Sequence, residues 1–206
     1  MKKELTIEDY KSGRTLYLTG EITKSSTADI EESINDIIID DESKWSDNVA
    51  SLKLLGEDYS NLYKTKNQFP PIKLIITSQG GSVYYGLGLY DFIRNINLNT
   101  QHKINVEING SAASMATIIM LASDVRTCGK NCSFMVHSIS SLTYGKIEEL
   151  KDDVKETERL NTIIKSIYKE RTNIDDALLN KIEKEKLDYW MSADEALKLG
   201  LVTNIG

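Results

Sequence analysis

A strand-like segment that leads directly into a small apolar helix constrains the fold of this chain more than any other feature. Apolar and polar residues alternate over Ile104–Ile108, which predicts a strand with one buried face. Residues Met115–Ala122 are apolar nearly all round, which predicts a short helix buried in a core. Ser114 stands at the junction. Its hydroxyl would lie beside the unpaired N–H groups of a helix N-terminus, which suit an oxyanion that forms next to it.

Two interpretations of this serine are open from the residues alone. Serine is a favoured N-cap residue, so Ser111 and Ser114 could simply cap a core helix. Alternatively, Ser114 is a nucleophile, and a nucleophilic serine needs a general base. The chain has only two histidines that could serve.

The two histidines lie in different surroundings. His102 belongs to the polar stretch Asn99–Lys103, which predicts a solvent-exposed imidazole. His137 follows the apolar strand pattern Ser133–Val136 and precedes a polar loop, so its ring can be held at a strand end while it faces a cleft. A buried histidine with a purely structural role is the alternative. Spacing does not select the carboxylate that would orient the ring, because the serine is followed by Asp124, Asp152, Asp153, Asp175, Asp176, Asp188 and Asp194.

Strand and helix patterns alternate along the rest of the chain. The strand pattern Thr15–Leu18 precedes a helical pattern that opens at Ser26 and carries Ile30, Ile34, Ile37 and Ile38 on one face. The strand pattern Ile72–Ile76 leads through Gly80 and Gly81 into a helix that starts near Val83. This alternation predicts an α/β fold with a largely parallel sheet.

Residues 40–69 interrupt the alternation. They are polar and acidic with scattered apolar side chains, and they end at the only two prolines, Pro70 and Pro71. The alternatives are a small helix that packs over the body and a solvated insertion.

Composition restricts the class of protein. The 206 residues suit one domain, 1–206, and a net charge of −6 argues against nucleic-acid binding. No apolar run approaches the length of a membrane span, and the polar start predicts no signal peptide, so we expect a cytoplasmic protein. Cys128 and Cys132 are expected to be reduced, and two histidines with two cysteines do not suggest a metal site.

Four segments give the chain a family resemblance. They are Ser78–Ser82, Gly110–Ala116, Phe134–His137 and Asp188–Ala196, the last of which runs on to Val202. In order and spacing they resemble the proteolytic subunit of the ATP-dependent Clp protease, from about residue 14 to residue 202. The Ala-Ala-Ser-Met core is fairly specific to that family, whereas the Gly-Gly loop and the Ser-Ala-x-Glu-Ala segment recur across the wider crotonase-like superfold.

The resemblance implies a site and a fold. It implies Ser114 as nucleophile, His137 as general base and Asp188 as the acid that orients the histidine. It also implies an oxyanion hole formed by the backbone N–H groups of Gly81 and Met115. Tyr189 and Trp190 would then shield Asp188 from water. The implied fold is the crotonase-like ClpP superfold of stacked parallel sheets and flanking helices, with a protruding handle over residues 138–171.

The handle implies an assembly. Residues 146–171 carry one apolar stripe, formed by Ile147, Leu150, Val154, Ile164 and Ile167. The stripe either packs on the parent domain or, as in the resembling family, interleaves between two seven-membered rings to form a hollow tetradecamer. The chain departs from the family in the loop after His137, which lacks a proline and a glycine pair. It departs again at Lys186-Leu187, where an acidic-arginine pair is usual.

The expected function is therefore a serine endopeptidase that cleaves unfolded polypeptides or short peptides inside an oligomeric barrel. No cofactor is expected, and ATP would act only through a partner AAA+ Clp unfoldase. Because Leu18-Thr19-Gly20 comes early, the residues before it leave little for an axial hairpin, which predicts weak or altered coupling to that unfoldase. The alternatives are a crotonase-like enzyme that acts on an acyl-thioester and a non-catalytic ring subunit.

Overall fold

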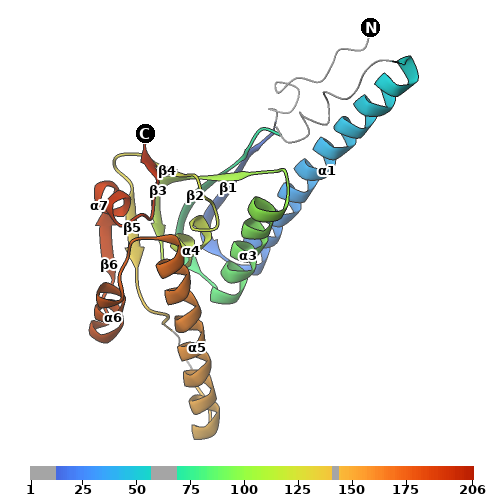
Figure 1. Cartoon of the computed structure of the whole chain (residues 1–206). Coiled ribbons are helices and arrows are strands. Elements are labelled where there is room, and N and C mark those ends of the chain that lie inside the picture. The colour runs from blue at the N-terminus through green and yellow to red at the C-terminus, as the bar shows by residue number, and fades with distance from the viewer. Residues whose placement is uncertain (1–12, 57–68, 141–143) are drawn as a thin grey trace.

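The computed structural model describes residues 13–56, 69–140 and 144–206 (Figure 1). Strands and helices alternate along the chain, as the sequence patterns predict. In order, the elements are β1 (Thr15–Ile22), α1 (Lys24–Leu55), β2 (Ile72–Gly81), α3 (Val83–Asn99), β3 (Ile104–Ala113), α4 (Met115–Met120), β4 (Arg126–Cys128), β5 (Ser133–Val136), α5 (Ile147–Arg171), α6 (Asp176–Glu185), β6 (Tyr189–Ser192), α7 (Ala193–Lys198) and β7 (Asn204–Ile205).

The strands form one sheet whose main path runs β1-β2-β3-β4-β7, with every neighbouring pair parallel. β3 is the central element because it has two successive partners on the same side of this path. Its first half pairs with β4, and its last residues, Ser111–Ala113, pair in parallel with β5. β5 in turn pairs antiparallel with β6. The predicted α/β class is confirmed, and the ends of β3 and β5 meet at one edge of the sheet.

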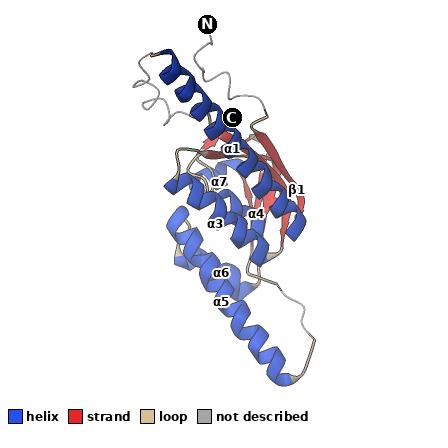
Figure 2. Ribbon diagram, turned by 90° about the vertical axis from the view of Figure 1, so that its right-hand side faces the viewer, coloured by secondary structure: helices blue, strands red, loops and turns tan. Residues whose placement is uncertain are grey.

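Helices α1 and α3 lie side by side and cover one face of the sheet (Figure 2). The core between helices and sheet is built mainly from branched aliphatic side chains, and every residue of α4 is buried. The apolar composition of Met115–Met120 leaves this helix no polar face, so it is stable only inside such a core. None of the described helices is both long and apolar enough to cross a membrane.

Helix α1 is longer than the sequence pattern predicts. Thr23 caps it in a capping box with Ser26, and it continues without a break to a left-handed Gly56. Residues 40–55 are therefore neither a separate small helix nor a solvated loop, and both expectations for them were wrong. The helix contains no glycine or proline, so the polar residues 40–55 can continue the helix that begins at Lys24. Residues 57–68, the rest of the predicted insertion, lie outside the described residues.

The extension of α1 also changes the surroundings of His102. This side chain is 1% exposed, so the prediction of a solvated imidazole is wrong. Its ring stacks on Phe69 with the centroids 4.3 Å apart, and its Nε2 lies 3.2 Å from Asp41 Oδ2. Asp41 on α1 accepts two hydrogen bonds from Arg14 Nη1, at 2.7 and 2.8 Å. The His102 ring is buried, although its neighbours Gln101 and Lys103 are exposed, because Asp41 on α1 and Phe69 lie against it.

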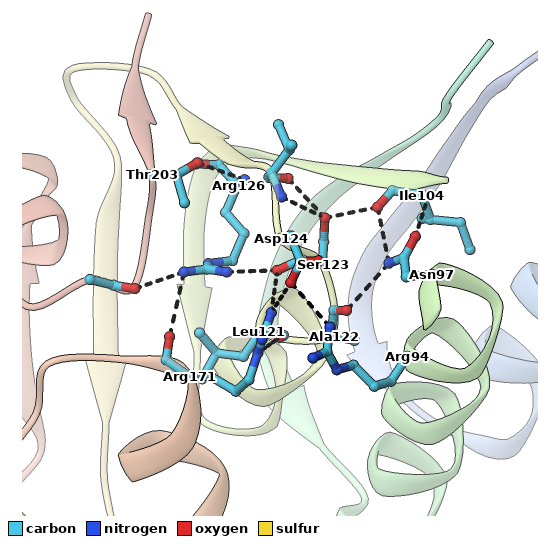
Figure 3. A network of polar contacts seen from close by, with 12 residues as sticks. Arg94, Asn97, Ile104, Leu121, Ala122, Ser123, Asp124, Arg126, Arg171 and Thr203 are labelled. Atoms are coloured by element: carbon cyan, nitrogen blue, oxygen red, sulfur yellow. Dashed lines mark hydrogen bonds and ion pairs between the residues drawn. The ribbon is translucent and has the colours of Figure 1, made fainter. Parts of the chain in front are cut away.

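A second buried arginine ties the C-terminal segment to the sheet (Figure 3). Arg126 on β4 donates from Nε to the Leu201 carbonyl, and from Nη1 and Nη2 to the carbonyls of Ser123 and Gly200. Burial lowers the pKa of this guanidinium to about 10, so it remains charged at neutral pH. One side chain thus provides hydrogen-bond donors for the Ser123 carbonyl after α4 and for the Gly200 and Leu201 carbonyls before β7.

Helix α5 projects away from the body on the side opposite to the free end of α1 (Figure 1). Its first half is exposed, and Ile147 and Val154 are 71% and 56% exposed. Its last turns are buried, and Ile164 and Ile167 belong to the core. The predicted stripe therefore has an exposed first half and a buried second half. Only the second half packs on the parent domain.

Candidate active site

Ser114 occupies a sharp turn between β3 and α4. Its backbone lies at φ 54° and ψ −126°, a positive φ that residues with a side chain rarely adopt. Its N–H donates to the Met135 carbonyl at 2.8 Å, which helps to hold the turn. The side chain makes no capping hydrogen bond to α4. The Ser114 hydroxyl therefore does not act as an N-cap, and at this strained strand-to-helix turn it is not bonded to the backbone of α4.

The hydroxyl of Ser114 faces His137. Nε2 of the imidazole lies 2.7 Å from Ser114 Oγ, within hydrogen-bond distance. The sheet accounts for this approach, because Ala113 pairs with Met135 at the parallel ends of β3 and β5. The histidine side chain is 24% exposed, so the ring is held by the body and still open to solvent.

Asp188 lies on the other side of the same ring. β5 and β6 are antiparallel and Val136 pairs with Tyr189, so the next residue outward on each strand brings His137 opposite Asp188. The distance from His137 Nδ1 to Asp188 Oδ1 is 3.4 Å, which is long for a hydrogen bond.

The predicted shielding of this carboxylate is wrong. The Asp188 side chain is 63% exposed, and Trp190 is 58% exposed. Successive residues of β6 face opposite sides of the sheet, so Met191 is buried and Trp190 points outward. Trp190 thus lies on the solvent-exposed face of β6 and leaves the Asp188 carboxylate open to water.

The end of β2 brings bare backbone against Ser114. Gly80 and Gly81 have φ angles of +100° and +151°. A Cβ atom on Gly80 would lie 2.7 Å from the Cβ of Ser114, and one on Gly81 would lie 2.4 Å from the Ile22 carbonyl oxygen. Both positions therefore require glycine because neighbouring atoms leave no room for a Cβ, as well as because the chain turns there.

The two backbone positions implied for the oxyanion hole border one cavity. Gly81 and Met115 line it together with Ser114 and His137. Met115 is the first residue of α4, so its N–H has no acceptor within the helix. N–H groups of this kind can stabilise a negative oxygen that forms on a carbon attached to Ser114.

The cavity beside Ser114 has a volume of about 210 Å³ and a mostly apolar wall. Its apolar and aromatic lining comes from Val83, Met115, Ile118, Ile139, Ile164 and Tyr168. A second cavity of about 340 Å³ also borders His137 and has a more polar wall, with Ser138, Ser140, Asn161, Glu183, Lys186 and Asp188 among its residues. His137 thus borders both an apolar and a more polar cavity, and Ser114 borders the apolar one.

Thr117 and Tyr168 are site residues that the sequence patterns did not reveal. Tyr168 lines the apolar cavity, and its hydroxyl lies 2.5 Å from Thr117 Oγ1. The two residues are 51 positions apart, and a helical period cannot indicate a hydroxyl pair across that separation. The buried stripe of α5 could have pointed to the tyrosine, since Ile164 precedes it by one turn.

No metal site emerges from the part of the chain that the structure describes, where no three His, Cys, Asp or Glu side chains gather. Cys128 and Cys132 are both buried and are not joined in a disulfide. Burial raises the pKa of the Cys128 thiol to about 11, so it is an unreactive thiol at neutral pH.

Comparison with known proteins identifies relatives of this chain. The family model for Clp protease matches residues 61–206. The ATP-dependent Clp protease proteolytic subunit of Deinococcus radiodurans is 31% identical over 147 residues, which cover 70% of this chain and 69% of the relative. Proteolytic subunit 1 of Salinibacter ruber is 28% identical over 163 residues, which cover 78% of this chain and 66% of the relative.

A solved structure has the same fold. A point mutant of ClpP1 from Listeria monocytogenes superimposes with a TM-score of 0.67 at 24% sequence identity, over 94% of this chain and 91% of that one. The stacked strands, flanking helices and projecting α5 are therefore the ClpP fold that the sequence resemblance implies. With the family match over most of its length, the chain belongs to the Clp protease family.

Proposed function

We propose that this chain is a serine endopeptidase in which Ser114 is the nucleophile. Its family supports a serine peptidase activity in general. The observation that carries the proposal for this chain is the 2.7 Å contact between Ser114 Oγ and His137 Nε2 at a strained turn. A hydroxyl held against an imidazole in this way can lose its proton as it attacks a carbonyl carbon.

The proposed reaction proceeds by acyl transfer. His137 accepts the Ser114 proton, and the serine oxygen bonds to the carbonyl carbon of the substrate peptide. The negative oxygen that forms is stabilised by the N–H groups of Gly81 and Met115. His137 then gives the proton to the leaving amine, and a water molecule releases the acyl group by the reverse steps.

Asp188 is proposed to orient the histidine. The carboxylate accepts from the Nδ1–H of His137, which leaves Nε2 free to accept the serine proton. Contacts of this kind are often long without substrate and tighten in the substrate complex. The distance of 3.4 Å is consistent with that behaviour.

Activity is expected to rise with pH, because only a neutral imidazole can accept the serine proton. Peptide cleavage measured across a pH series in wild type and in His102→Gln should give the same profile shape, since His102 contacts Asp41 and Phe69. A His137→Gln variant should be nearly inactive at every pH. If His102→Gln were inactive and His137→Gln active, His137 would not be the general base.

The apolar cavity beside Ser114 predicts a preference for apolar side chains on the acyl side of the cleaved bond. Its lining contains no Asp, Glu, Lys or Arg side chain, and each buried CH₂ contributes about 0.8 kcal/mol. In a fluorogenic peptide series that differs only at this position, leucine should exceed alanine in kcat/KM by at least about tenfold, and aspartate should be the poorest. Equal cleavage of the leucine and aspartate peptides would contradict this role for the cavity.

Self-assembly into two seven-membered rings is part of the proposal, as is partnership with an AAA+ Clp unfoldase for folded substrates. The family supports ring assembly and an unfoldase in general. In this chain the exposed first half of α5, with Ile147 and Val154, is suited to pack between rings.

The assembly proposal predicts the effect of charge on that surface. Replacing Ile147 and Val154 by aspartate should split double rings into single rings or smaller species while the subunit stays folded, because both side chains are exposed in the subunit. Sedimentation velocity measures the change. The same substitution at Ile164 should unfold the subunit, since that side chain lies in the core. A wild type that sediments as a monomer at every concentration would rule the rings out.

The crotonase-like alternative is less well supported by this site. An enzyme that acts on acyl-thioesters with backbone N–H groups alone needs no hydroxyl paired with an imidazole. Here that pair lines the cavity. A non-catalytic ring subunit would have no use for the pair either, and both alternatives predict no covalent reaction of Ser114 with an electrophile.

A further inference from the structure

The last turn of α5 reaches the backbone of the nucleophile through two hydroxyl groups. Thr117 Oγ1 donates to the Ser114 carbonyl oxygen at 2.6 Å, and the Thr117 N–H donates to the same oxygen at 3.0 Å. The hydroxyl of Tyr168 lies 2.5 Å from Thr117 Oγ1. Both side chains are almost fully buried, with Thr117 at 0% and Tyr168 at 2% exposed.

The direction of these hydrogen bonds follows from the number of protons. A carbonyl oxygen can only accept, so the single hydroxyl proton of Thr117 is committed to Ser114. The contact between the two hydroxyl oxygens must then use the proton of Tyr168. Burial raises the pKa of the Tyr168 phenol, so this donor stays protonated throughout the range in which the protein would be assayed.

Fixing the Ser114 carbonyl also fixes the Met115 N–H. The two groups belong to one planar peptide unit, and the described residues contain no cis peptide bond. In a trans unit the carbonyl and the N–H point in opposite directions. With the Ser114 oxygen held against Thr117, the Met115 N–H points back toward the start of α4, where Gly81 and Ser114 border the cavity.

The same turn of α5 holds the other end of α4. Arg171 donates from Nε to the Leu121 carbonyl at 3.0 Å and from Nη2 to the Ser123 carbonyl at 3.2 Å, and it forms an ion pair with Asp124 (Figure 3). Tyr168 and Arg171 stand one helical turn apart. Helix α4 is thus bound by α5 at both ends, through side chains that have no part in the proton transfers.

We propose that Tyr168 is a positioning residue, which acts through Thr117 to aim the Met115 N–H at the oxyanion formed during peptide cleavage. This inference rests on the proposed serine peptidase function. The hydrogen bonds run from Tyr168 to Thr117 and from Thr117 to the Ser114 carbonyl. They stabilise the oxyanion through the Met115 N–H when negative charge develops on the substrate oxygen. They should therefore influence kcat more than KM.

Removing the tyrosine hydroxyl tests the proposal without emptying the cavity wall. In Tyr168→Phe the aromatic ring still lines the cavity, so KM should change by less than about twofold while kcat falls by about tenfold to a hundredfold. Thr117→Val should have a similar effect, and Thr117→Ser should retain most of the activity because it keeps the hydroxyl. The double variant Tyr168→Phe/Thr117→Val should be no slower than Thr117→Val alone, since both changes break one chain of hydrogen bonds.

Each kcat is referred to the concentration of reactive serine, measured by titration with a fluorophosphonate, so that a partly unfolded variant is not counted as a slow one. Tyr90→Phe is the matched control, because this buried tyrosine lies on α3 outside the cavity and should keep wild-type kcat. A titrated Tyr168→Phe with wild-type kcat overturns the inference, whether or not its melting temperature falls. A wild type that neither cleaves peptides nor reacts with the fluorophosphonate overturns the proposed function itself.

Discussion

Peptide cleavage by Ser114→Ala is expected to fall by about 10⁴- to 10⁶-fold relative to wild type. The substitution removes the oxygen that lies 2.7 Å from His137 and changes little volume. Alanine and serine are similarly strained at a φ of 54°, so the fold and the assembly should be unchanged. Turnover of a fluorogenic peptide measures the loss, and sedimentation and circular dichroism check the structure.

Ser111→Ala is the matched control for this loss. Ser111 lies within β3, where its backbone pairs with Ser133. It stands three residues before Ser114, and the strand continues beyond it to Ala113. Its variant should cleave peptides at close to the wild-type rate. A Ser114→Ala protein that keeps the wild-type turnover would remove this residue from the mechanism.

Asp41→Ala is expected to lower the free energy of unfolding by about 3–5 kcal/mol. Asp41 is 1% exposed and Arg14 is 6% exposed, so the substitution leaves a buried guanidinium without its carboxylate. His102 loses the same neighbour. Urea denaturation followed by circular dichroism measures the change.

The adjacent aspartate provides the comparison. Asp40 pairs with Lys44 on the exposed side of α1, and its side chain is 58% exposed. Asp40→Ala should therefore cost no more than about 0.5 kcal/mol. Equal unfolding midpoints for the Asp40 and Asp41 variants would mean that the ion pair with Arg14 does not hold the extended α1 to the body.

Local sequence was sufficient to predict the two strand ends that carry Ser114 and His137, and the catalytic roles of the two residues remain a prediction. The strand-to-helix junction at Ser114 is encoded between Ile104 and Ala122, because the period of apolar residues changes there. The same holds for His137, which stands directly after a short apolar strand. That the two side chains meet depends on the pairing of β3 with β5, which fixes both strand ends at one edge.

Asp188 could not be selected from spacing, because its position depends on pairing between distant segments. It lies opposite His137 only since β6 runs antiparallel to β5. Family resemblance singled it out among the downstream aspartates, and its role remains a prediction. The predicted shielding by Trp190 failed because the face of β6 that carries this side chain is exposed to solvent.

The two other errors share one cause. Residues 40–55 have a polar helical sequence, and polarity alone does not distinguish a solvated segment from a helix that covers part of the core. The burial of Asp41 is decided by Arg14, which is 27 residues away. Asp41 on α1 also lies against His102. The same missed contact therefore led to two wrong predictions, one of a solvated insertion and one of an exposed histidine.

The stripe on α5 shows the limit of periodicity as a guide to partners. The same apolar spacing runs through both halves of the helix, yet Ile164 is buried in the core and Ile147 is exposed. A hydrophobic period indicates which face will be covered and does not say by what. The structure of the subunit separates the two halves, and the first half is left for the proposed contact between rings.

Reaction with a fluorophosphonate, followed by intact mass and peptide mapping, tests the central claim most directly. We expect one adduct per chain, on the peptide that contains Ser114, and a much slower reaction in His137→Gln because the base is missing. A folded wild type that forms no adduct, or one that carries the label on another serine such as Ser111, would contradict the assignment of Ser114 as the nucleophile.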